Sequence, residues 1–137
     1  MTTNTTTSVG EMTDVEILRH ASKLMQAHAV AATQGPWTSS LVWSPDSHAT
    51  SGIYSNAHPT GTPASEVVAS GRRGARGFGG IRDPRNARHI VSWQPPVALA
   101  VAAWLDREVF NAERRVPVYV EPSALAVARA YIEAAAR

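Results

Sequence analysis

The 137-residue sequence contains no cysteine. This absence excludes a disulfide framework, a thiol nucleophile and a cysteine-based zinc site. Residues 1–12 have neither a basic start nor an apolar run, so they do not form a signal peptide. The longest apolar stretch, Val97 to Leu105, is too short to span a bilayer. We therefore expect a folded cytoplasmic protein without a membrane partner.

Lysine is almost absent, with one lysine against twelve arginines. Residues 1–70 carry two basic side chains and five acidic ones. Between Gly71 and Arg88, by contrast, six arginines accompany a single acid, Asp83. Positive charge concentrated in this way indicates a binding site more than a general coating of charge.

Catalytic and metal-binding signatures are also missing. The chain contains no GxSxG nucleophile elbow and no HExxH pair, and its five histidines are dispersed. We therefore expect no enzymatic activity, no cofactor and no metal site.

Apolar periodicity predicts a single α+β domain over residues 13–137, preceded by a flexible tail at residues 1–12. Thr13 to Glu16 matches a capping box and starts an N-terminal helix that ends near Thr33. Alternation then predicts a small antiparallel β-meander. Its strands are expected at residues 36–43, 52–55 and 65–70.

About three C-terminal helices are expected to pack on this sheet. Asp83 as N-cap and Pro84 as first residue start a helix that ends near residue 93. Longer helices follow at residues 96–114 and 123–136. Between them, the alternating valines of residues 116–120 indicate an edge strand whose valine side chains face the core. The helix over residues 96–114 has an apolar face broad enough to be buried on two sides. The residues of this face are Val97, Val101, Trp104, Leu105 and Val109. Three tryptophans, Trp37, Trp93 and Trp104, are expected in the core.

The segment GRRGARGFGG, Gly71 to Gly80, is the best candidate ligand site. Closely spaced glycines allow backbone N–H groups to converge, and arginines donate bidentate hydrogen bonds to phosphate. The segment also leads to a helix N-terminus, where anions bind, although Asp83 adds a negative charge and Pro84 removes a donor there. A solvated hairpin is the alternative. The candidate ligand-binding residues are Arg72, Arg73, Arg76, Phe78, Arg85, Arg88 and His89.

Two of these residues have more than one interpretation. Phe78 could stack on a base or anchor the segment in the domain. His89 could donate to phosphate or act as a general base, or it could be a structural histidine. Trp43, at the end of a strand, is instead a candidate for contact with a protein.

Two segments of the sequence resemble those of a known family. They are AATQGPW, Ala31 to Trp37, and NARHIVSWQPPVALAVAAWLD, Asn86 to Asp106. Together they resemble small accessory proteins of bacteriophages and prophages, the Ead-like proteins and their actinobacterial relatives, and they cover about a third of the chain. Gln34 stands where the commonest form of the family has proline. The resemblance implies a phage-encoded, non-virion protein, and it transfers no catalytic residues. Such a protein is expected in the cytoplasm of the host cell. The arginine-rich, lysine-poor composition also suits an actinobacterial host.

Three functions follow as hypotheses. The first is a non-enzymatic binding protein for a phosphate-bearing ligand, either a nucleotide signal or nucleic acid, that counteracts host defence. The second is an inhibitor or adaptor that binds a host protein through Trp43 and the apolar helix face. The third is a virion or assembly component. An oligomer is compatible with each of them.

Overall fold

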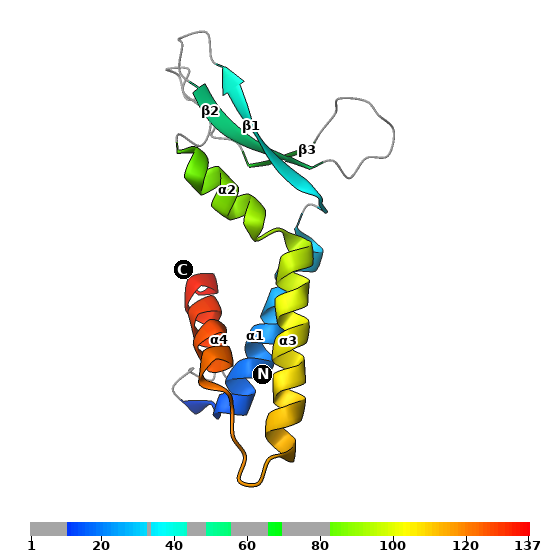
Figure 1. The fold of residues 1–137 in the computed structure, drawn as a ribbon, viewed down its shortest axis with the longest axis vertical. Coiled ribbons are helices and arrows are strands. Elements are labelled where there is room, and N and C mark those ends of the chain that lie inside the picture. The colour runs from blue at the N-terminus through cyan, green and yellow to red at the C-terminus, as the bar shows by residue number, and fades with distance from the viewer. Residues whose placement is uncertain (1–10, 33, 44–48, 56–65, 70–82) are drawn as a thin grey trace, which may run out of the picture. The chain divides into compact units, whose positions relative to one another are not determined.

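The computed structural model describes residues 11–32, 34–43, 49–55, 66–69 and 83–137. Within these residues, seven elements follow one another (Figure 1). They are α1 (Asp14–Ala31), β1 (Trp37–Trp43), β2 (Ala49–Ser55), β3 (Glu66–Ala69), α2 (Pro84–Ser92), α3 (Pro95–Arg114) and α4 (Pro122–Ala135). The chain divides into two compact units, residues 1–28 with 99–137 and residues 29–98.

The N-terminus of α1 confirms the predicted capping box. The backbone N–H of Thr13 donates to Glu16 Oε2 at 2.7 Å, and the N–H of Glu16 donates to Thr13 Oγ1 at 3.3 Å. These bonds satisfy donors that the first turn of a helix leaves without a partner. The bond from the Thr13 N–H, together with that from the Thr13 hydroxyl, lowers the pKa of the Glu16 carboxyl group.

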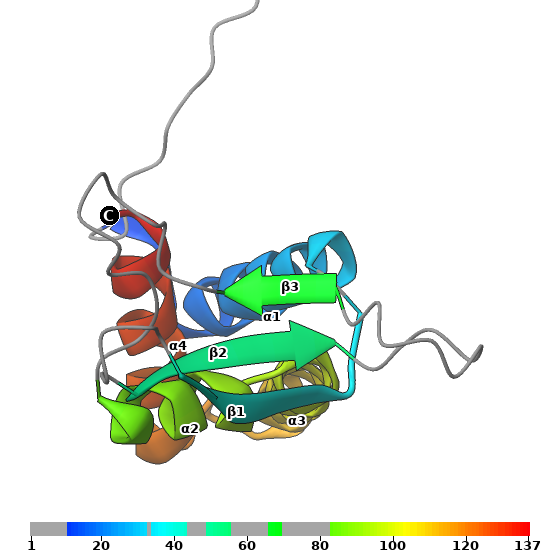
Figure 2. The same ribbon diagram turned by 90° about the horizontal axis from the view of Figure 1, so that it is seen from above.

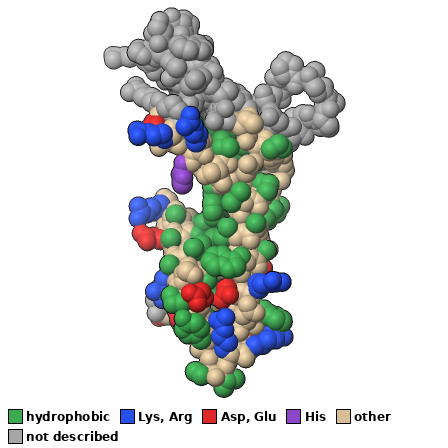
Figure 3. All heavy atoms as spheres, viewed as in Figure 1, with side chains coloured by type: hydrophobic (Ala, Val, Ile, Leu, Met, Phe, Trp, Pro, Cys, Tyr) green, Lys and Arg blue, Asp and Glu red, His purple; other side chains and the backbone are tan. Residues whose placement is uncertain are grey.

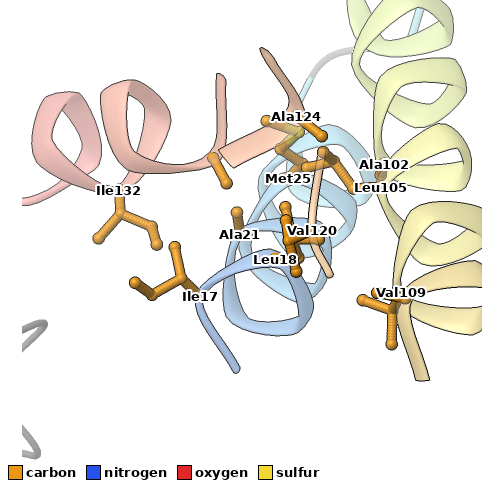
Figure 4. Packing of buried hydrophobic residues seen from close by; sticks show 12 residues of the cluster. Ile17, Leu18, Ala21, Met25, Ala102, Leu105, Val109, Val120, Ala124 and Ile132 are labelled. Carbon is orange, nitrogen blue, oxygen red and sulfur yellow. The ribbon is translucent and has the colours of Figure 1, made fainter. Parts of the chain in front are cut away.

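The first unit is built around an apolar core that α1, α3 and α4 form together (Figure 4). Alanines supply a large part of this core, and small side chains allow neighbouring helices to approach closely. Burial of this apolar surface is the main force that holds the three helices together. The core residues are Ile17, Leu18, Ala21, Met25, Ala102, Leu105, Val109, Ala112, Val120, Ala124, Ala128 and Ile132.

Ser22 of α1 is a polar side chain that is fully buried in this unit. Its hydroxyl donates to the carbonyl oxygen of Ala102 on α3 at 3.0 Å and accepts from Gln26 Nε2 at 3.0 Å. Gln26 Nε2 also donates to Asp106 Oδ2 at 3.1 Å. Because a buried polar group is costly without a partner, these bonds favour one alignment of α1 against α3.

The second unit contains the three strands and α2. The strands pair antiparallel in the order β1-β2-β3, with β2 between the other two (Figure 2). The pairing of β2 with β3 is irregular between Ile53 and Tyr54. Helix α2 packs against β1 and β2, and Ile53 and Ala87 are fully buried in this unit.

The predicted fold class, an α+β domain whose C-terminal helices pack on a β-meander, is wrong. The described structure is mostly helical, with helices of 18, 9, 20 and 14 residues against strands of 7, 7 and 4. The largest core consists of residues of α1, α3 and α4 together with Val120 of the connection before α4, and no described strand residue belongs to it. The strands are short and rich in Ser, Thr and Gly, whereas α1, α3 and α4 each carry an apolar stripe. Burying those stripes against one another removes more apolar surface from water.

The predicted edge strand at Val116 to Val120 is also wrong. Residues 115–121 form an irregular connection between α3 and α4 (Figure 1). Only Val120 of its three valines is buried, while Val116 and Val118 are exposed. The β-propensity of valine reflects packing on a sheet, and this connection has no neighbouring strand within the described first unit.

Candidate functional site

The described part of the predicted ligand site lies at the start of α2. Asp83 has extended backbone angles and accepts a hydrogen bond from the backbone N–H of Arg85 at 2.9 Å, which confirms Asp83 as the N-cap. Pro84 occupies the first helical position, where the lack of an N–H carries no cost. One donor of this helix terminus, the N–H of Arg85, is therefore already bound to a carboxylate of the chain itself.

The guanidinium group of Arg85 is bound to the same carboxylate. Arg85 Nη2 lies 2.8 Å from Asp83 Oδ2, and Arg85 Nε lies 3.0 Å from Asp83 Oδ1. This pairing lowers the pKa of Asp83 and raises that of Arg85. An incoming phosphate would have to compete with Asp83 for Arg85, so the pair weakens the case for an anion at this position.

Arg88 and His89 are exposed on α2. Arg88 forms no ion pair within the described part of the chain, so its charge is available to a ligand. The remaining predicted ligand residues, Arg72, Arg73, Arg76 and Phe78, lie outside the described residues. The phosphate-site hypothesis therefore remains a prediction.

Trp43, the predicted protein-contact residue, is the last residue of β1 and pairs with Ala49 of β2. The description covers its backbone and not its side chain. Its proposed contact with a partner remains a prediction as well.

The two segments that carry the family resemblance are in contact within the second unit. Gln94 Oε1 accepts a hydrogen bond from the backbone N–H of Trp37 at 2.9 Å, which links the start of α3 to the start of β1. Gly35 leaves room for this contact, because a Cβ atom there would lie 3.0 Å from Gln94 Oε1. Gln34 Nε2 lies 3.0 Å from the carbonyl oxygen of Ala32, just after α1, a contact that a proline at this position could not make. In this protein residues of both segments make contacts that stabilise the fold of the second unit.

Part of the apolar face of α3 is exposed. Leu105 and Val109 face the core as predicted, but Trp104, expected in the core, is 38% exposed. Val101, one turn before it, is only partly buried. Figure 3 shows hydrophobic side chains in a band over the visible face of this unit, with charged side chains around it. The broad apolar face was readable in the sequence, but which part of it neighbouring helices cover was not.

The described residues hold no cluster of three or more His, Cys, Asp or Glu side chains suited to a metal ion. None of the described helices combines the length and apolar character needed to cross a membrane. Comparison with known proteins found no matching family model, curated protein or solved structure. The relation to Ead-like proteins is therefore a prediction.

Proposed function

We propose that this protein is a non-enzymatic binding module that docks a protein partner on the uncovered side of α3. The observation that carries the proposal is Trp104, a large aromatic side chain that stays 38% exposed beside a well-packed core. Tryptophan is among the residues that contribute most to protein interfaces, where its ring is fully desolvated. Val101 extends the apolar surface by one helical turn.

The helix that presents Trp104 is firmly held. Leu105 and Val109, on the adjacent side of α3, are buried among α1 and α4 (Figure 4). The Ser22 hydroxyl binds the α3 carbonyl group of Ala102 two residues before Trp104. A rigid helix loses little conformational entropy when a partner binds, which favours affinity. The resemblance to phage accessory proteins makes a host protein the expected partner.

The test compares Trp104→Ala with Phe110→Ala, a matched change at an exposed aromatic residue elsewhere on α3. Each purified variant is used to capture proteins from an actinobacterial lysate, after thermal unfolding has shown that it is folded. We expect a partner that wild type and Phe110→Ala retain and that Trp104→Ala loses. Equal capture by all three proteins, or capture of nothing, would refute the proposal.

A phosphate-bearing ligand, a nucleotide or nucleic acid, is the second candidate, and the exposed Arg88 and His89 favour it. Thermal unfolding with a panel of nucleotides and short DNA tests this function. A ligand present at about 100 times its dissociation constant stabilises the folded state by about 2.7 kcal/mol. The shift should disappear in a variant with Arg72, Arg73 and Arg76 all changed to alanine. Absence of any shift would exclude the ligands in the panel.

A further inference from the structure

The connection between α3 and α4 presents apolar side chains to solvent at one end of the helical unit (Figures 1 and 3). Val116 is 97% exposed, Val118 62% and Tyr119 52%. We call residues 115–121 the tip. Large apolar side chains gathered on a surface mark a place where another molecule binds.

The tip is held in a defined conformation. Arg115 Nη1 donates to the carbonyl oxygen of Tyr119 at 2.9 Å, and its guanidinium lies 5.6 Å from the centre of the Tyr119 ring. Val120 is buried in the core and fixes the far side of the tip. The exposed valines are therefore displayed by an ordered segment, which lowers the entropy cost of binding.

The two ends of the tip carry opposite charges, so the tip of one copy is complementary to the tip of another. Arg115 precedes Val118 by three residues and Glu121 follows it by three, so the segment runs from basic through apolar to acidic. Glu121 is exposed, its side chain does not cap α4, and it forms no ion pair with any described residue. Arg115 has one described ion-pair partner, Glu108, with the charged atoms 3.8 Å apart, which is beyond hydrogen-bond distance.

We propose that the tip binds the tip of a second copy of this chain, with the two segments antiparallel about a twofold axis near Val118. Antiparallel alignment places Arg115 of each copy opposite Glu121 of the other and brings the exposed valines together. Opposite charges facing each other across an interface fix the alignment of the two copies and speed their association. An interface formed by the same patch on both copies closes after two subunits, so the product is a dimer and not a fibre.

Charge reversal gives the first test. Arg115→Glu and Glu121→Arg each place like charges opposite each other, and we expect each variant alone to have a dimer dissociation constant raised about tenfold or more. A mixture of the two variants restores both opposite-charge pairs in a heterodimer. Sedimentation over a concentration series should therefore show dimers in wild type and in the mixture, but far fewer in either variant alone. A damaged tip would not recover on mixing, so recovery supports the charge pairing, whereas dimers that form equally in wild type and in each variant alone would overturn the proposal.

Disulfide trapping gives a second test that does not depend on these charges. Because the chain has no cysteine, Val118→Cys introduces a single thiol next to the proposed axis. Two such thiols can join only if their Cα atoms come within about 7 Å. Ala130→Cys, at an exposed position of α4, is the matched control. We expect oxidation to trap the Val118→Cys dimer much faster than the control. Equal rates, or a wild-type protein that stays monomeric throughout the concentration series, would overturn the proposal.

Discussion

Replacing Ala128 by leucine tests the close packing of the alanine-rich core. Ala128 of α4 is fully buried, and Ala124 and Ile132 lie one turn before and after it on the same side. A leucine adds three carbon atoms at a position without free space, so side chains or helices must shift. Overpacking of this kind costs about 1–3 kcal/mol of unfolding free energy. For a unit of this size, each kcal/mol lowers the melting temperature by about 4–8 °C.

Ala130→Leu is the matched control, because Ala130 is exposed on the same helix. Alanine and leucine have nearly the same helix propensity, so the two variants differ mainly in packing. Thermal unfolding followed by circular dichroism at the helix band should give an Ala128→Leu midpoint about 8–16 °C below that of Ala130→Leu, for a loss of about 2 kcal/mol. Midpoints that agree within about 2 °C, well below the shift for 1 kcal/mol, would refute the close packing of α4 inferred here.

Three further outcomes are expected. Gln94→Ala removes the acceptor of the Trp37 N–H, so this amide should exchange its hydrogen faster while the helical unit keeps its stability; unchanged exchange would contradict the contact. Glu16 has a lowered pKa, so its contribution is present above the pKa of the unfolded chain and is lost as pH falls through the folded value. Unfolding midpoints of wild type and Glu16→Gln should therefore differ at neutral pH and converge in acid, and a constant difference would argue against the Thr13 bond. Ser22→Ala removes the hydroxyl group that donates to the α3 carbonyl group of Ala102 and should cost about 1 kcal/mol in denaturant unfolding, whereas a neutral effect would show that the bond is unimportant.

Local signals in the sequence located the helices well. The capping box at Thr13 and Glu16 and the N-cap at Asp83 are contacts between residues two or three positions apart. Such contacts depend on side-chain chemistry and backbone geometry within one turn, so the rest of the fold hardly alters them. The observed helices begin within one residue of the predicted starts.

Contacts between distant residues limited the prediction of the site. The hydrogen bond from Trp37 to Gln94 spans 57 positions in the sequence, and no local pattern around either residue indicates it. The apolar face of α3 shows that Leu105 and Trp104 could both be buried, but not that Leu105 is fully buried while Trp104 stays 38% exposed. The Gly/Arg segment, the centre of the predicted ligand site, lies outside the described residues, so that hypothesis still depends on the sequence alone.

The sequence by itself determined where the helices begin and which side of each is apolar, because capping and periodicity act within a few residues. Tertiary structure decided which apolar surfaces meet. It assembled α1, α3 and α4 into one core, where the sequence had indicated helices on a sheet. It also left the valines at 116 and 118 in solvent, where their β-propensity had indicated a strand, because a strand forms only beside a neighbour that pairs with its backbone.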